Sequence, residues 1–325
     1  MINVLIILVV LIVLEVLFLK SANSFGLMDM PNERSSHQRP TIRGAGFVIG
    51  LSLMLSLLLF DIEGRWYLSG GSLLIFATGF YDDTKGSSPL VRTIFQSIAT
   101  LLMIYGLGLF DTQLPIMLAL ILIVSVGTIN AVNFMDGING ISALYGLLML
   151  SCYIYLNSKV SYLPMEFIVS SGLGLIVFGA INIRKRALAF AGDVGSTGLG
   201  YLLILFTVLW MFKESSLVYF LFWAVYGVDS TLTIVERIIK RQNIFGAHRS
   251  HLYQLLSNEL NWGHLKVGFV YVGVQVLINC VALYLILNKT PDSWWITVVL
   301  LLFLGVVYMV IKQQVKSRVK QSSTS

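Results

Sequence analysis

The sequence predicts an all-α integral membrane protein, and three observations lead to that fold class. Charged residues make up only 12% of the 325 positions, hydrophobic residues make up 57%, and the mean hydropathy is +0.84. A soluble domain carries roughly 25% charged residues, so these charges are too few to cover a water-exposed surface. The hydrophobic residues form continuous runs rather than alternating patterns, which excludes a β-barrel. The same composition excludes a disordered chain, a nucleic-acid-binding domain and an ordinary soluble enzyme.

The apolar runs predict a polytopic bundle of eleven transmembrane helices. A helix needs about 20 apolar residues to cross a bilayer. The runs that approach this length lie near 2–19, 44–60, 66–80, 93–110, 115–133, 138–156, 163–182, 197–212, 216–235, 267–287 and 294–311. The runs 66–80 and 197–212 are short, which leaves a count of ten open.

The distribution of Lys and Arg predicts the orientation of the bundle. With the N-terminus outside, 18 of the 22 Lys and Arg residues fall on the cytoplasmic side, as the positive-inside rule requires. The C-terminus is then cytoplasmic. We expect residues 1–312 to form a single transmembrane domain with cytoplasmic loops at about 20–43, 81–92, 133–140, 183–196 and 236–266, and residues 313–325 to form a cytoplasmic tail.

Four aspartates stand in Gly-containing segments on the predicted cytoplasmic side. Asp82 and Asp83 lie in GFYDDTKG, Asp136 lies in NAVNFMDGING, and Asp193 lies in FAGDVGS. Each motif alone is typical of a turn or a helix cap. Three such motifs at one interface instead favour a shared site for a metal and a phosphate, because Mg²⁺ is usually held by one or two carboxylates together with substrate phosphates. Mn²⁺ is the alternative metal.

Two of these segments also have helical features that suit such a site. Asn130, Asn133 and Asp136 are spaced three apart, so one helical face carries all three. The segment that contains Asp193 directly precedes an apolar run, and a helix that starts there offers free N–H groups to an anion.

A basic segment supplies candidate phosphate ligands. His248, Arg249 and His251 lie in FGAHRSHLYQ, at some distance from the end of the preceding apolar run. Arg presents a planar fork that suits phosphate, and His can donate to it. Arg92 begins the fourth predicted span and either joins these ligands or extends its side chain to the membrane surface.

Two further polar residues have two interpretations each. Asp229, in GVDSTLT, would be costly if it faced lipid, so it lies either on the wall of the site or in a helix–helix hydrogen bond. His37 belongs to the loop from 32 to 43, which either closes over the site or is an ordinary basic cytoplasmic loop.

The order of the motifs resembles that of a known family. PNERSSHQRPTIRGAG, GFYDDTKGSSPLVRTIFQ, NAVNFMDGINGI, FAGDVGSTGLGY, GVDSTLTIVERI and HRSHLYQ follow one another as in the polyprenyl-phosphate N-acetylhexosamine-1-phosphate transferases of glycosyltransferase family 4. The resemblance covers nearly the whole chain. Within the family, HRSHLYQ is most similar to the group that initiates O-antigen synthesis.

The resemblance implies an activity and a location. A UDP-N-acetylhexosamine would give its sugar 1-phosphate to undecaprenyl phosphate, which releases UMP. The enzyme would be a multi-pass protein of the bacterial inner membrane with its active site on the cytoplasmic face, and a homodimer is compatible with the family. The donor sugar (GlcNAc, FucNAc, QuiNAc or a 4-amino derivative) stays open, because the members that initiate enterobacterial common antigen carry a His-x-His-His run of which only the first His is present here, as His251.

The resemblance also implies residue roles. Asn133 and Asp193 correspond to the Mg²⁺ ligands, and Asp82, Asp83 and Asp136 correspond to the catalytic carboxylates. Further correspondences assign Asn139 and Phe190 to the uracil and Arg249, His251 and Arg92 to the diphosphate.

The chemistry leaves two mechanisms and one competing class of protein. Asp82 or Asp83 deprotonates the lipid phosphate for a single displacement, or an aspartate attacks first and forms a covalent intermediate. A transporter or flippase of a sugar or lipid carrier is the competing class. Transporters carry ionisable residues near the bilayer midplane, whereas most acids of this chain gather toward the membrane surfaces.

Overall fold

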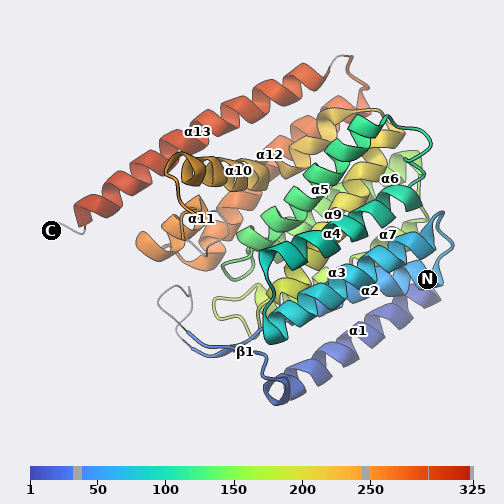
Figure 1. The fold of residues 1–325 in the computed structure, drawn as a ribbon, viewed down its shortest axis with the longest axis horizontal. Coiled ribbons are helices and arrows are strands. Elements are labelled where there is room, and N and C mark those ends of the chain that lie inside the picture. Colours follow the sequence, from blue (N-terminus) through green and yellow to red (C-terminus); the bar gives the residue numbers. More distant parts are fainter. Residues whose placement is uncertain (32–38, 244–248, 292, 323–325) are drawn as a thin grey trace.

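A computed structural model describes residues 1–31, 39–243, 249–291 and 293–322 of the chain as a bundle of helices (Figure 1). The α-helices are α1 (Ile2–Ser21), α2 (Phe47–Leu59), α3 (Arg65–Lys85), α4 (Pro89–Gly106), α5 (Pro115–Met135), α6 (Ile141–Val160), α7 (Met165–Ser171), α8 (Leu173–Asn182), α9 (Gly192–Lys213), α10 (Ala224–Ile239), α11 (Leu252–Gln254), α12 (His264–Leu287) and α13 (Ser293–Ser322). Short 3₁₀-helices cover η1 (Ala22–Phe25) and η2 (Leu217–Trp223), and η3 (Leu255–Glu259) is a π-helix. The predicted all-α membrane fold is confirmed.

Each of the eleven expected spans falls on helical structure. Within the described residues, nine helical segments are long and apolar enough to cross a membrane. The other two expected spans fall on α2 and α3. α2 has only 13 residues, and α3 carries four charged side chains among its 21 residues. The number of crossings and their direction therefore stay predictions.

Two expected spans are not continuous α-helices. The run 163–182 is divided into α7 and α8 at Gly172, where an added Cβ would overlap the side chain of Leu150. The run 216–235 begins as the 3₁₀-helix η2 and becomes the α-helix α10 only at Ala224. Apolar composition predicts that these segments are buried in the membrane, but it does not show where tertiary packing interrupts a helix.

The core is built around α9. Of its apolar span, 94% is buried, against 17% for α1 and 11% for α13. α9 packs on α2, α3 and α5, while α1 and α13 lie at opposite edges of the bundle (Figure 1). Because α9 begins at Gly192, Asp193 lies in the first turn of the most buried helix of the bundle.

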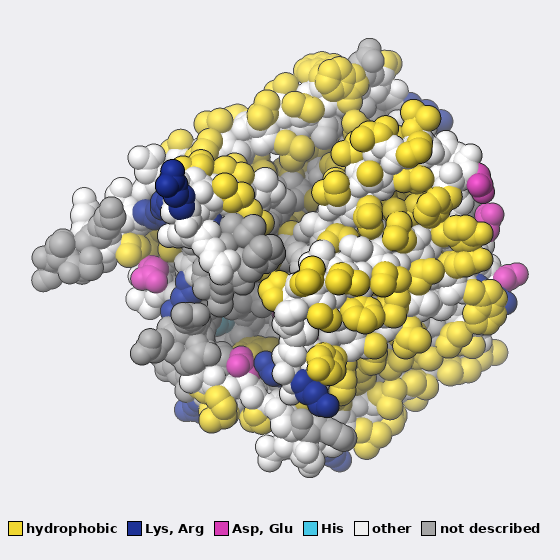
Figure 2. All heavy atoms as spheres, in the orientation of Figure 1, with side chains coloured by type: hydrophobic (Ala, Val, Ile, Leu, Met, Phe, Trp, Pro, Cys, Tyr) yellow, Lys and Arg dark blue, Asp and Glu magenta, His cyan; other side chains and the backbone are white. Residues whose placement is uncertain are grey.

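The surface is divided along the bundle axis. On the face drawn in Figure 2, a hydrophobic belt separates two charged ends, and Lys and Arg gather mainly at the end that carries β1 and α11. The first residues of α1 and the last residues of α13 lie at opposite ends of the bundle (Figure 1).

The only regular strands among the described residues form a hairpin at the basic end. β1 (Met28–Asp29) pairs antiparallel with β2 (Thr41–Ile42), and Ile42 also bridges to Ala189. The sequence patterns do not predict this hairpin. At the other terminus, α13 continues through Ser322, so the expected tail from residue 313 is largely an extension of the last helix.

Candidate active site

The carboxylates of Asp82 and Asp193 meet at the basic end of the bundle. They come from the last turn of α3 and the first turn of α9, and their carboxyl groups lie within hydrogen-bonding contact. Arg92, near the start of α4, donates from Nη1 to Asp82 Oδ2 at 2.9 Å, and the same nitrogen lies 3.8 Å from Asp193 Oδ2. Asn133 of α5 donates to Asp193 Oδ1 and, at 2.8 Å, to Ser196 Oγ. Four helices thus bring together side chains that the sequence places in three separate motifs.

Asp83 stands next to this cluster but is bonded differently. Its Oδ1 accepts the backbone N–H of Asp193 at 2.9 Å, and its Oδ2 accepts the backbone N–H of Val194 at 3.0 Å. The side chain is buried. A carboxylate at this position satisfies two free N–H groups at the N-terminus of α9 and complements the helix dipole. The structure therefore gives Asp83 a capping role that is additional to the predicted catalytic one.

Glycines allow the close approach that this capping requires. A Cβ added to Gly79 of α3 would lie 2.5 Å from the Cα of Val194, and one added to Gly195 of α9 would lie 2.5 Å from the Cα of Gly46. Gly192 has φ of +71° and lies against Gly44 and the Asp83 carboxylate. Backbone therefore packs on backbone where α2, α3 and α9 meet, and Asp83 can reach the first turn of α9.

Asn130, Asn133 and Asp136, which the sequence predicts on one helical face, have different surroundings. Asn130 donates to Gln96 Oε1 at 2.6 Å, which ties α5 to α4 rather than to the aspartates. Asn133 faces Asp193, as described above. Asp136 follows the last residue of α5 and is half-buried. Burial, together with the nearby charge of Asp83, raises the pKa of Asp136 to about 6.

The two residues assigned to uracil lie on neighbouring loops. The Asn139 amide nitrogen donates to the carbonyl oxygens of Arg184 and Lys185 at 3.3 and 3.2 Å. Asn182, at the end of α8, accepts the N–H of Gly140 at 2.8 Å and donates to Ala189, whose neighbour is Phe190. The Asn139 loop and the Phe190 loop are thus held together, although the Asn139 amide N–H is already bonded to protein.

The described part of HRSHLYQ, residues 249–254, lies against the end of α5. The hydroxyl of Tyr253 donates to the carbonyl oxygen of Phe134 at 2.8 Å, and an added Cβ on Gly137 would overlap that hydroxyl. His251 is 1% exposed and contacts the buried Asp229 through Nδ1 at 3.0 Å. Arg249 is half-buried. Of the two interpretations of Asp229, the structure shows a buried hydrogen-bonding position.

Two predicted residues cannot be placed. His37 and His248 lie outside the described residues. Their proposed roles stay predictions.

Sequence reasoning missed three residues that the structure brings to the cluster. Arg43 donates to the carbonyl oxygen of Asp83, Ser196 accepts from Asn133, and Gln96 accepts from Asn130. Arg43 lies in a basic loop and Ser196 follows the GDVG motif, so each had a positional signal. Gln96 is the last residue of GFYDDTKGSSPLVRTIFQ, but its place inside an apolar run gave no sign that it contacts Asn130.

The residues around Asp82 and Asp193 suit a divalent cation that also binds substrate phosphates. Asp82, Asp193, Arg92 and Gln96 contribute to the lining of a small cavity. Within the described ranges, no three His, Cys, Asp or Glu side chains converge as a metal cage. Two touching carboxyl groups with an amide beside them match the Mg²⁺ pattern of few protein ligands completed by water and phosphate oxygens.

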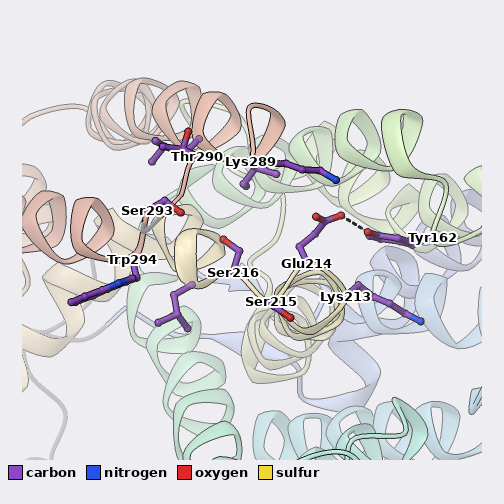
Figure 3. A pocket seen from close by; sticks show the side chains of 12 residues that line it. Tyr162, Lys213, Glu214, Ser215, Ser216, Lys289, Thr290, Ser293 and Trp294 are labelled. Atoms are coloured by element: carbon purple, nitrogen blue, oxygen red, sulfur yellow. Dashed lines mark hydrogen bonds between the residues drawn. The ribbon is translucent and has the colours of Figure 1, made fainter.

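A larger cavity, of about 700 Å³, lies at the opposite end of α9. Lys213, Glu214, Lys289 and Trp294 contribute to its lining, and Tyr162 donates a hydrogen bond to Glu214 across one side of it (Figure 3). Twenty residues of α9 separate Asp193 from Lys213, which is about 30 Å along a helix. This cavity is therefore remote from the aspartate cluster.

Comparisons with known proteins point to one family. The profile described as "Glycosyl transferase family 4" matches residues 65–211. The chain is 24% identical over 312 residues to the Bacillus subtilis protein named "Probable undecaprenyl-phosphate N-acetylglucosaminyl 1-phosphate transferase", with 88% of this chain and 85% of the relative covered. It is 26% identical over 293 residues to the Escherichia coli K12 "Undecaprenyl-phosphate alpha-N-acetylglucosaminyl 1-phosphate transferase", with 81% and 76% covered. A Yersinia pestis protein of the same name is 25% identical over 293 residues, with the same coverage.

Proposed function

The chain belongs to glycosyl transferase family 4, and from that premise we propose that it transfers a sugar 1-phosphate from a UDP-N-acetylhexosamine to undecaprenyl phosphate. The products would be undecaprenyl-diphospho-sugar and UMP. The relatives' names give both the lipid acceptor and the type of group transferred.

One observation carries the proposal. Asp82, Asp193, Asn133 and Arg92 converge at one end of the bundle, where the hydrophobic belt gives way to a basic surface. A polyprenyl acceptor stays in the bilayer, whereas a UDP-sugar arrives from water. A polar cluster where the membrane-embedded surface ends is accessible to both. We place this end in the cytoplasm of a bacterial inner-membrane protein, because Lys and Arg concentrate there.

We propose Mg²⁺ as the cofactor, with Asp193 and Asn133 as its protein ligands and Asp82 beside them. The Asn133 amide nitrogen is bonded to Asp193 and Ser196, which leaves its carbonyl oxygen for a cation. When bound, Mg²⁺ neutralises the donor diphosphate and makes UMP a better leaving group.

The chain's own residues would perform the remaining steps. Arg92 holds the Asp82 and Asp193 carboxylates together and offers positive charge to the diphosphate. Both oxygens of Asp83 are occupied by backbone N–H groups, so Asp83 is poorly placed as a nucleophile. Asp82 is also hydrogen-bonded, through Oδ1 to the Ser87 N–H and through Oδ2 to Arg92, so Asp136 is the carboxylate better placed to accept a proton from the lipid phosphate. This arrangement favours a single displacement over a covalent intermediate.

We propose that the reaction initiates O-antigen or a related envelope polysaccharide. The relatives' names specify N-acetylglucosaminyl transfer. In this chain, Tyr253 and Gln254 stand where the family members that initiate enterobacterial common antigen, by resemblance, carry the last two histidines of a His-x-His-His run. The donor is therefore to be sought among GlcNAc, FucNAc, QuiNAc and their 4-amino derivatives.

The test is UMP release from membranes or purified enzyme with undecaprenyl phosphate, Mg²⁺ and each UDP-sugar in turn. We expect one donor to be used, and we expect activity to disappear with EDTA and to return with Mg²⁺ or Mn²⁺. If a folded preparation fails to release UMP with every one of these UDP-sugars, the proposal is wrong. Exchange of labelled UMP into the UDP-sugar in the absence of lipid would instead reveal the covalent route.

A further inference from the structure

Asp229 of α10 is a carboxylate in a hydrophobic region that the proposed reaction does not use. It is 0% exposed, and it accepts hydrogen bonds from the hydroxyls of Tyr271 at 2.6 Å and Tyr308 at 2.8 Å. These tyrosines belong to α12 and α13. A buried carboxylate is costly unless several hydrogen-bond donors surround it. An apolar residue at this position would need no such donors.

Two further donors come from consecutive residues of the HRSHLYQ segment. His251 Nδ1 lies 3.0 Å from Asp229 Oδ1, and the backbone N–H of Leu252 lies 3.3 Å from the same oxygen. A carboxylate can only accept, so the hydrogen bond to Asp229 requires a proton on Nδ1 of His251. Asp229 thereby holds both a side chain and the backbone of the segment.

The rest of the segment is fixed relative to this anchor. The N–H of His251 donates to the Gln254 side chain in a capping box that starts α11. Tyr253 then reaches Phe134 and lies against Gly137, the residues on either side of Met135 and Asp136. A chain of contacts therefore runs from Asp229 through His251 and Tyr253 to the end of α5.

We infer that Asp229 is a positioning residue of the active site. Through His251 and the backbone of Leu252, it holds residues 249–254 beside Asp136 and so places Arg249 for the donor diphosphate. The inference rests on the proposed function for the diphosphate. It also assigns to the buried His251 an anchoring role where the sequence predicts a direct phosphate contact.

The placement itself can be tested without any activity. Two variants, His251→Phe and Tyr308→Phe, each remove one donor from the same oxygen, Asp229 Oδ1. If Asp229 anchors the segment, amide hydrogen exchange at residues 249–256 rises by about tenfold or more in His251→Phe and stays unchanged in Tyr308→Phe. Equal exchange in the two variants, or no change in either, overturns the inference.

The link to catalysis requires a double-mutant cycle between Asp229→Ala and Arg249→Gln. Arg249→Gln should lower kcat/KM by about 10- to 100-fold in the native background, but by less than about threefold when Asp229 is already replaced, because coupled residues are not additive. Equal losses in both backgrounds would mean that Asp229 only packs helices. Asp229→Asn retains a carbonyl acceptor and should recover most of the activity lost in Asp229→Ala.

The two proposals fail in different ways. If the native protein releases no UMP with any donor, the proposed function is wrong, and the exchange experiment still decides whether Asp229 holds the segment. If the native protein is active but the exchange is unchanged, the positioning role alone is wrong.

Discussion

At the scale of single residues, adjacent aspartates have different environments. Asp82 faces Asp193 and Arg92, whereas Asp83 faces the backbone N–H groups of Asp193 and Val194. Sequence alone treats the pair as equivalent, because both belong to the same motif. The direction of each side chain on α3 decides which one touches the cavity and which one caps α9.

We therefore expect Asp83→Asn and Asp82→Asn to have different effects. An amide at position 83 accepts only one of the two backbone N–H groups, and an unmet buried donor costs about 1–3 kcal/mol. Asp83→Asn should lower the unfolding temperature in detergent and abolish UMP release. Asp82→Asn keeps an acceptor for the Ser87 N–H and loses only the part-exposed pair with Arg92, so it should abolish activity with a smaller fall in unfolding temperature. Similar unfolding temperatures in the two variants would contradict the capping role.

Asp136 allows a prediction about pH. Its pKa in the folded protein is about 6, against an ordinary value of 3.8, so the folded state binds this proton more tightly than the unfolded state. The associated stability is present at low pH and is lost as the pH rises through 6. Asp136→Asn should therefore raise the unfolding temperature relative to the native protein at about pH 8, and less so at about pH 4, while it abolishes activity. Asp111→Asn, at an exposed position, is the control, and an equal gain at both pH values would argue against a raised pKa.

At the scale of elements, the apolar runs predict the helices, but they do not predict their contacts. All eleven expected spans fall on helices because bilayer thickness fixes the length of an apolar run. The break at Gly172 and the β1–β2 hairpin have no such signal. The approach of α3 to α9 depends on small residues in each helix, and pairing them requires knowledge of which helices are neighbours.

The contact between α3 and α9 can be tested with two alanine substitutions in α3. Gly79→Ala would place a Cβ 2.5 Å from the Val194 Cα, so the helices must separate. Gly70→Ala meets only the Leu102 side chain, at an ordinary 3.5 Å. We expect Gly79→Ala to lose at least about 100-fold in activity, because a shift of about 1 Å in a site can cost that much. Gly70→Ala should keep near-native activity, and equal activity in the two variants would show that the close approach does not matter.

At the scale of the whole molecule, the candidate site is an assembly of segments that the sequence separates widely. The sequence motifs predict that Asp82, Asp136 and Asp193 share one side of the membrane, and the fold brings their segments to one end of the bundle. The motifs could not predict that Asn130 bonds Gln96, or that Asp229 is enclosed by Tyr271 and Tyr308, because these partners lie in apolar runs. Long-range polar contacts inside a membrane protein leave no periodic pattern.

The orientation of the bundle decides which compartment supplies the donor, and it can be measured directly. Lys159, in the last turn of α6, and Lys185, after α8, are both exposed and flank the segment that contains α7 and α8. In a background without Cys152 and Cys280, Lys159→Cys should react with a membrane-impermeant maleimide added to intact cells, and Lys185→Cys should react only after the membrane is opened. The charge asymmetry predicts this result, because Lys185 belongs to the basic end and Lys159 is one of the few cations expected outside. The opposite pattern would put the aspartate cluster outside the cell, where UDP-sugars are not supplied from the cytoplasm, and would overturn the proposed reaction together with the topology.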